Sequence, residues 1–312
     1  MPHSFEAITG TRAAFRRLPG RGLVRATGAD RVRFLNGMLT ADVAKLPAGG
    51  AAPALQLDRK GHVLAELCVL AEPESLLLDI APGVEAELCA LLEKHVIADD
   101  VAFASLSEAK AWLALEGPEA RDAARRVGGA VPEPGRFARA DFAGQAVLWI
   151  AQGALTADGL RAIVPRALAA ELERALALPE LAEEAAEVLR IDARLPLLGR
   201  DVGARNFPQE AGLERAISFS KGCYIGQEIV ARIASRGAVN RVLVLLRADS
   251  AVTPGASVSV DGSAVGQVTS AARSDATGAI ALAYLKVEHA HAGQRVAIDG
   301  VPAEVTGGTS RR

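Results

Sequence analysis

The end of the chain is the part whose sequence most restricts the fold. From Gly237 onward, short apolar runs alternate with polar turns, and the dipeptides Asp261-Gly262 and Asp299-Gly300 stand between such runs. Asp-Gly is typical of two-residue hairpin turns, in which both residues adopt positive φ. The strands expected here are residues 239–246, 257–260, 264–268, 280–285 and 295–298. Closely spaced strands of this kind predict a small β-barrel domain.

The part before residue 237 mixes strand-like and helix-like patterns. Apolar runs at 54–57 and 63–70 flank Asp58-Arg59-Lys60-Gly61, which is typical of a hairpin turn. Other strands are expected at 23–27, 76–80, 146–150 and 160–164, and helices at 84–95, 165–176, 179–192 and after an N-cap at Asp30. We therefore predict an α+β fold: two interleaved ferredoxin-like lobes in residues 1–236 and a β-barrel domain in residues 237–312.

Charge and cysteine content exclude several classes of protein. The net charge of −2 provides no general attraction for nucleic acid or an acidic membrane. No apolar run approaches the roughly 20 residues that span a bilayer, and the N-terminus lacks the pattern of a signal peptide. Three cysteines without a C-x-x-C pair favour reduced thiols over disulfides or a zinc site. We expect a cytoplasmic protein without a metal site, in which Cys68 and Cys89 are inert core residues.

One segment, residues 217–232, carries the residues best suited to chemistry. Cys223 lies between Gly222 and Gly226, just before a helix expected from Gln227, and Lys221 is two residues away. A helix N-terminus and a nearby cation both favour a thiolate. Between Arg215 and Arg247, six basic residues stand against one acid, Glu228, which suits an anionic ligand or partner. They are Arg215, Lys221, Arg232, Arg236, Arg241 and Arg247.

A second interpretation of this segment needs no ligand. A single cysteine in a globular protein is often a small buried apolar residue, and a basic run is often only a solvated face. From the residues alone, an anion site with an activated thiol and an ordinary packed segment both stay open.

Residues 221–228 reproduce the pattern K-G-C-Y-x-G-Q-E without a departure. In this signature the chain resembles the YgfZ-type folate-binding family, whose members are relatives of the glycine-cleavage T-protein, an aminomethyltransferase. Matching segments extend the resemblance over roughly residues 23–305. They are P-Q-E-A at 208–211, L-R-I-D-A at 189–193, L-T-x-D-V at 39–43, D-x-K-G at 58–61 and the stretch 236–241.

The resemblance implies three lobes around a central channel that holds tetrahydrofolate. It also implies a role in assembling or repairing iron–sulfur clusters, including those of tRNA-methylthiolating enzymes, with Cys223 as the reactive residue. The partners implied are a folate, which can be polyglutamylated, and iron–sulfur client or carrier proteins. The residues expected to bind the folate are Lys221, Gly222, Tyr224, Gly226, Gln227, Glu228, Thr40, Asp42, Lys60 and Arg236.

Several of these residues have an alternative structural interpretation. Lys221, Tyr224 and Gln227 could line the channel or could hold the turn in shape. Thr40 and Asp42 could belong to a helix cap, and Lys60 to a hairpin turn.

Departures from the T-protein pattern bear on enzymatic activity. Where T-proteins carry a glutamate in G-Y-T-G-E-D-G, the corresponding stretch 153–159 has Ala157. We therefore expect an accessory protein rather than an aminomethyltransferase, although catalytic turnover stays open. The alternatives are a folate-dependent aminomethyl or methyl transferase, and a scaffold that docks a cluster carrier and uses folate only structurally.

Overall fold

A computed structural model gives the structure of residues 3–237 and 239–307, apart from the side chain of Arg236. The chain forms two compact units. The two-sheet unit comprises Thr11–Leu181 and Arg215–Gln227. The barrel unit comprises Met1–Gly10, Ala182–Glu214 and Glu228–Arg312. The predicted domain boundary at residue 237 stays a prediction.

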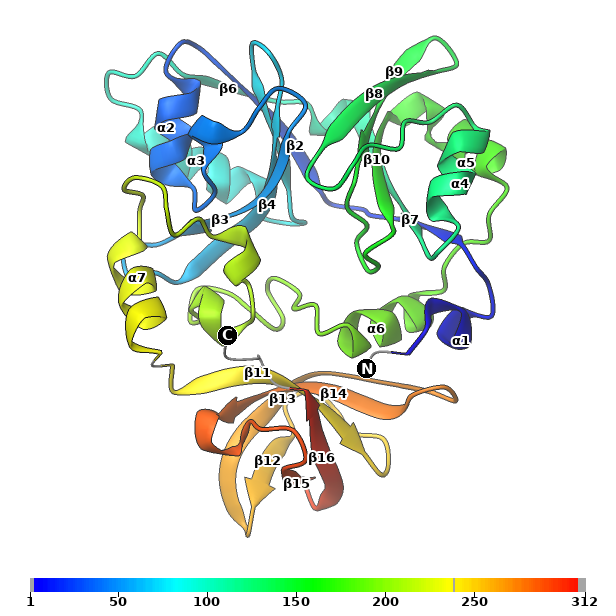
Figure 1. Ribbon diagram of the computed structural model, residues 1–312, viewed down its shortest axis with the longest axis vertical. Helices are drawn as coiled ribbons and strands as arrows, with labels where there is room; N and C mark the ends of the chain where they lie inside the picture. The colour runs from blue at the N-terminus through cyan, green and yellow to red at the C-terminus, as the bar shows by residue number, and fades with distance from the viewer. Residues whose placement is uncertain (1–2, 238, 308–312) are drawn as a thin grey trace. The chain divides into compact units, whose positions relative to one another are not determined.

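The first sheet of the two-sheet unit is antiparallel throughout, with the strand order β3-β4-β5-β2-β6. Helices α2 and α3 cover one face, where Leu35 and Leu92 pack on Val24 and Leu78 of the strands (Figure 1). The predicted turn at 58–61 does join β3 to β4. The bounds are β2 Gly22–Thr27, β3 Ala51–Leu57, β4 Val63–Ala71, β5 Leu76–Ile80, β6 Ala102–Ser105, α2 Arg31–Met38 and α3 Glu85–His95.

The second sheet is also antiparallel, in the order β1-β7-β10-β9-β8, with helices α4 and α5 on one face (Figure 1). The helix expected over 165–176 starts later, because residues 166–168 form a 3₁₀ turn first. The bounds are β1 Ala14–Arg17, β7 Lys110–Glu116, β8 Phe137–Phe142, β9 Gln145–Ile150, β10 Leu160–Pro165, α4 Ala120–Arg126 and α5 Ala169–Leu176.

The faces of the two sheets that carry no helices pack against each other and form what we call the inter-sheet layer. Its centre is apolar and includes Leu23, Cys68, Leu77, Trp112 and Ile163. Side chains alternate between the two faces of a strand, so the residues two positions away along these strands face the same layer. Many of the residues two positions away from the apolar centre are charged. They lie toward the two ends of the inter-sheet layer, which are therefore polar.

The barrel unit contains a closed barrel with the strand order β11-β14-β13-β12-β15-β16. The predicted barrel and both of its hairpin turns are confirmed: Asp261, Gly262, Asp299 and Gly300 all have positive φ. The last strand, β16, was not expected from the sequence. The bounds are β11 Arg241–Ala248, β12 Ser257–Val260, β13 Ser263–Ser274, β14 Gly278–Lys286, β15 Arg295–Ile298 and β16 Val301–Gly307.

Three helices complete the barrel unit, namely α1 (Phe5–Thr9), α6 (Glu183–Asp192) and α7 (Gln227–Arg236). The helix expected over 179–192 begins only at Glu183, because Pro179 and Leu181 pair through their backbone with Phe15. Asp30 is at the N-cap of α2, yet its carboxylate accepts hydrogen bonds from Asp100 N and from the side chain of Arg33 rather than from the backbone of the helix. Within the described part of the chain, no helix has the length and apolarity to cross a membrane.

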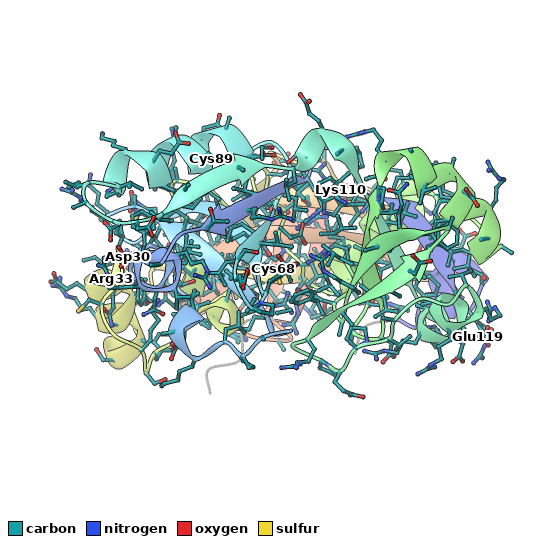
Figure 2. All side chains as sticks on the ribbon, turned by 90° about the horizontal axis from the view of Figure 1, so that it is seen from above. Asp30, Arg33, Cys68, Cys89, Lys110 and Glu119 are labelled. Carbon is teal, nitrogen blue, oxygen red and sulfur yellow. The ribbon has the colours of Figure 1, made fainter. Side chains whose placement is uncertain are left out.

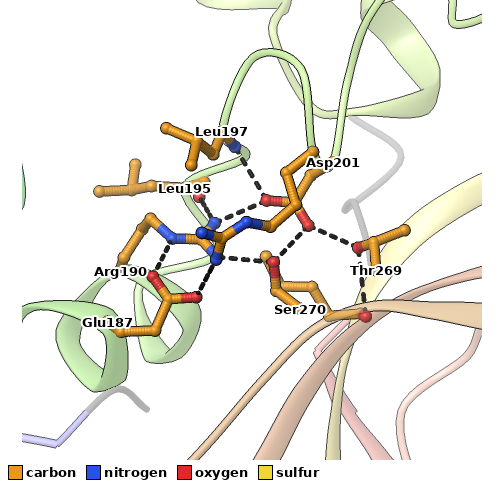
Figure 3. A network of polar contacts seen from close by, with 9 residues as sticks. Glu187, Arg190, Leu195, Leu197, Asp201, Thr269 and Ser270 are labelled. Atoms are coloured by element: carbon orange, nitrogen blue, oxygen red, sulfur yellow. Dashed lines mark hydrogen bonds and ion pairs between the residues drawn. The ribbon is translucent and has the colours of Figure 1, made fainter. Parts of the chain in front are cut away.

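A buried polar network attaches α6 to the barrel (Figure 3). Arg190 donates to both Asp201 Oδ2 and Ser270 Oγ at 2.7 Å, and Asp201 Oδ1 accepts from Ser270 Oγ at 2.7 Å. Asp201 is 2% exposed and Arg190 is 6% exposed. Buried charges are tolerated when they are paired and fully hydrogen-bonded, as they are here.

Candidate functional site around Cys223

The segment 215–227, which we call the cysteine loop, belongs to the two-sheet unit. Cys223 lies in it and is exposed, as the reactive residue implied by the resemblance would have to be. The other two thiols differ from it. Burial raises the pKa of Cys68 to about 12 and that of Cys89 to about 11, so both are protonated at neutral pH. The reactive form of a cysteine is the thiolate, and these two are therefore poor nucleophiles.

Lys221 fixes the cysteine loop to the end of α2. Its Nζ donates to the carbonyl oxygens of Asn36, Leu39 and Ala41 at 2.5, 2.6 and 2.8 Å. The last carbonyls of a helix have no partner within the helix, and a lysine can satisfy them. Burial lowers the pKa of Lys221 to about 8, although Asp42 opposes this shift. Of its two predicted roles, these contacts support the structural one.

Thr40 holds the start of the cysteine loop. It is fully buried, and its Oγ1 donates to Ala216 O at 2.6 Å and accepts from Leu55 N at 2.8 Å. Its carbonyl accepts from Ser218 N at 2.9 Å. The L-T-x-D-V segment therefore ties the loop to β3. Asp42 accepts from Lys45 N at 3.3 Å and so caps a short 3₁₀ turn, residues 43–45.

Gly226 rests on the hairpin turn of the D-x-K-G segment. Its φ is +84°, and a Cβ at this position would lie 2.6 Å from Asp58 O. Asp58 Oδ1 shapes that turn by accepting from Lys60 N and His62 N, both at 2.8 Å. The side chain of Lys60 is exposed. Three sequence segments with family-like patterns thus meet at the cysteine loop.

The remaining signature residues close the loop. Tyr224 is 8% exposed, its ring lies 4.9 Å from Lys221 Nζ, and burial raises its pKa to about 12. Its backbone N–H donates to Gln227 Oε1 at 3.3 Å. Glu228 is exposed and forms an ion pair with Arg232 at 2.6 Å. Gly222 is exposed, and no atom would contact a Cβ placed there. Binding of folate by these residues stays a prediction.

The predicted excess of positive charge over residues 215–247 is smaller in the fold than in the sequence, because acids from other segments approach two of the six basic residues. Arg241 pairs with Glu210 at 3.3 Å, and Arg247 approaches Asp192 at 3.5 Å. Both acids lie outside the segment in which the charges were counted, and the fold brings them in. Arg232 is paired with Glu228, and Lys221 is bound by carbonyls. Arg215 is exposed, and the side chain of Arg236 lies outside the described residues.

Sequence analysis missed a buried polar cluster at one end of the inter-sheet layer. Asp79 is fully buried and pairs with Arg161 at 2.7 Å and with Arg21 at 2.9 Å. Trp112 Nε1 also donates to Asp79 at 3.0 Å. Burial raises the pKa of the nearby Glu66, against the fields of Arg21, Arg215 and Arg161. The available signal was an aspartate within the apolar run 76–80.

The loop that corresponds to the T-protein glutamate motif is built around a different carboxylate. Glu116, at the end of β7, is fully buried and accepts from the backbone N–H groups of Ala154, Leu155 and Thr156 at 2.6–3.0 Å. Ala157 is exposed. Among residues 3–237 and 239–307, no group of three or more His, Cys, Asp and Glu side chains could hold a metal ion.

Comparison with known proteins places this architecture in a family. The family model of the GCVT N-terminal domain matches residues 21–221, and that of the glycine cleavage T-protein C-terminal barrel domain matches residues 241–308. The tRNA-modifying protein YgfZ of Yersinia enterocolitica is 30% identical over 234 residues, which are 72% of this chain and 68% of that protein. The chain belongs to the YgfZ-type family of T-protein relatives.

Enzymes of the wider family are also similar to this YgfZ-type chain. An aminomethyltransferase of Exiguobacterium sibiricum is 28% identical over 304 residues, 93% of this chain and 84% of that enzyme. The crystal structure of the glycine cleavage system aminomethyltransferase T from Bartonella henselae matches with a TM-score of 0.87 at 21% identity, covering 97% of this chain and 87% of that one. The predicted α+β lobes and C-terminal barrel are thereby confirmed.

Proposed function

We propose that this YgfZ-type protein binds a folate and uses Cys223 to support the assembly or repair of iron–sulfur clusters in client enzymes. The observation that carries the proposal is the presentation of Cys223. Cys223 is exposed, whereas Lys221 and Tyr224 near it are buried and Gly226 rests on the turn at 58–61. Thiolates are ligands of iron–sulfur clusters and are nucleophiles, and both uses require access.

The remainder of the proposal draws on the relatives. The Yersinia protein is named as tRNA-modifying, which supports clients that modify tRNA. The glycine cleavage T-protein domains support tetrahydrofolate as the ligand. We place the protein in the cytoplasm, with a folate and iron–sulfur client or carrier proteins as its partners.

The central test is Cys223→Ser. In cells that lack the wild-type protein, we expect this variant to lose support for cluster-dependent enzymes, measured as their activity and as the methylthiolated fraction of tRNA. The melting temperature and the dissociation constant for tetrahydrofolate should stay within experimental error, because the side chain is exposed.

Cys89→Ser is the matched control, since that thiol is half-buried on α3 and has a raised pKa. It should retain full support in the same cells. Wild-type support from Cys223→Ser, or equal loss in both variants, would contradict the role of Cys223. Absence of tetrahydrofolate binding by the wild-type protein would contradict the folate part alone.

Aminomethyl transfer is the second candidate function. It is favoured by the aminomethyltransferase relative, which aligns with 93% of the chain. The exposed Ala157 and the inward-directed Glu116 oppose it, because the loop lacks a free carboxylate at the position of the T-protein glutamate. Turnover of an aminomethyl donor with tetrahydrofolate, measured with purified protein, would establish the second candidate.

A further inference from the structure

The end of the inter-sheet layer opposite to Asp79 carries an excess of positive charge. Arg25, Lys110 and Arg139 lie on β2, β7 and β8, each two positions from a residue of the apolar centre, with Glu72 as their neighbouring acid. We call these four residues the Lys110 cluster, and Figure 2 labels Lys110 along the seam where the two sheets face each other. We propose that the Lys110 cluster binds an oxyanion, namely a phosphate or carboxylate group.

The single acid of the cluster is already engaged. Glu72 forms an ion pair with Arg139, and its other carboxylate oxygen accepts a hydrogen bond from Ser75 Oγ at 2.5 Å. Its side chain is 12% exposed, whereas that of Arg139 is 50% exposed. Glu72 therefore neutralises one guanidinium, and two positive charges remain in the cluster.

The remaining cations have no acidic partner of their own among the contacts of the described residues. Arg25 Nε is buried and has no hydrogen-bond partner in that part of the chain. An unsatisfied buried donor costs free energy, and such donors usually face a water or a ligand. The pKa of Lys110 is lowered, first by burial and then by the fields of Arg139 and Arg25. The free protein therefore holds these cations near one another against repulsion.

The two ends of the inter-sheet layer differ in a way that bears on binding. At the Asp79 end, two carboxyl groups, Asp79 and Glu66, face Arg21 and Arg161, and Glu66 also lies in the field of the exposed Arg215. At the Lys110 end, three cations share one carboxylate. An anion at the Lys110 end would supply negative charge to balance the cations, and it would accept a hydrogen bond from Arg25 Nε. Guanidinium groups favour phosphate and carboxylate because their paired N–H groups match two oxygens.

The test uses the full chain and two probes, inorganic phosphate and citrate, titrated calorimetrically at constant ionic strength. We expect at least one probe to bind to wild-type protein with a dissociation constant on the order of 1 mM or lower. Binding of phosphate alone, of citrate alone or of both supports the proposal and identifies the oxyanion group preferred. Binding of neither overturns it.

Lys110→Gln assigns the binding to the cluster. We expect it to weaken binding at least tenfold and, without a probe, to raise the melting temperature, because it removes a repelled cation. Lys94→Gln, at an exposed position on α3, is the matched control and should bind as the wild type does. Unchanged binding by Lys110→Gln, or equal weakening in the control, would overturn the proposal. Cys223→Ser should bind each probe as the wild type does, so the result is independent of the proposed cluster-repair function.

Discussion

Gly222 and Gly226 are neighbours of Cys223 in sequence, yet their surroundings differ. Gly226 has positive φ and packs on the turn at 58–61, so it needs both the conformational freedom and the small size of glycine. Gly222 is exposed and would leave a methyl group in open space. One glycine of the signature is therefore required for packing, whereas the other leaves the surface beside the sulfur free.

Single substitutions at Gly226 and Gly222 test this difference. Gly226→Ala should lower the free energy of unfolding by about 2 kcal/mol or more, because alanine is strained at this φ and its Cβ would press on Asp58 O. Gly222→Ala should change it by less than about 0.5 kcal/mol. Urea unfolding of both variants measures the difference. Equal stabilities would show that the loop does not rest on the turn as described.

At the scale of elements, the cysteine loop is joined to α2, β3 and the β3–β4 turn by contacts from Lys221, Thr40 and Gly226. The lysine of the signature thus acts first as a cap for the end of α2. These contacts link segments that are more than 150 residues apart in sequence. The position of Cys223 consequently depends on the folding of the first sheet.

Lys221→Met tests that link. It leaves three carbonyl groups without their donor, so we expect a loss of about 2–4 kcal/mol in stability at pH 7 and faster proteolysis within 215–227. The pH dependence has a defined sign. Because the pKa of about 8 in the folded protein lies below the 10.5 of a free lysine, the folded state binds fewer protons between these values.

Wild-type stability should accordingly rise relative to Lys221→Met as the pH increases from 8 to 10.5. Urea unfolding of both proteins at several pH values measures this difference. A difference that is constant with pH would contradict the lowered pKa, whereas a fully stable Lys221→Met would contradict the capping role.

At the scale of the whole molecule, the barrel unit includes chain from well before its first strand. Residues 182–214 fold with the barrel, and the network of Arg190, Asp201 and Ser270 joins the two parts. Asp201 accepts from Leu197 N at 2.9 Å and from Thr269 Oγ1 at 2.5 Å as well. Its carboxylate is the centre of this attachment.

Asp201→Ala should therefore cost about 3–5 kcal/mol, since it leaves Arg190 buried with only part of its compensation. Glu187→Ala, which removes the partly exposed partner of the same arginine, should cost about 1 kcal/mol. Thermal unfolding compares the two. A larger loss of stability from Glu187→Ala than from Asp201→Ala would show that the buried carboxylate of Asp201 is not the main attachment of residues 182–214 to the barrel.

The features that could be predicted from the sequence are those that depend on residues close together in the chain. The hairpin turns at Asp58, Asp261 and Asp299 depend on residues a few positions apart, and they were predicted correctly. The apparent basic patch failed because Arg241 and Arg247 pair with Glu210 and Asp192, which only the fold brings near. Likewise, no local pattern indicates that Lys221 caps a helix about 180 residues earlier. From the residues alone, an exposed and a packed Cys223 both stayed open, and the contacts of Thr40 and Lys221 that anchor its loop were not predicted.

The contrast among the three thiols has a practical consequence. A single equivalent of a maleimide dye at neutral pH should attach at position 223 and leave the other two sulfurs untouched. The natural chain would then carry a fluorescent reporter at its proposed working centre, without any engineered substitution, for observing ligands and clients as they arrive.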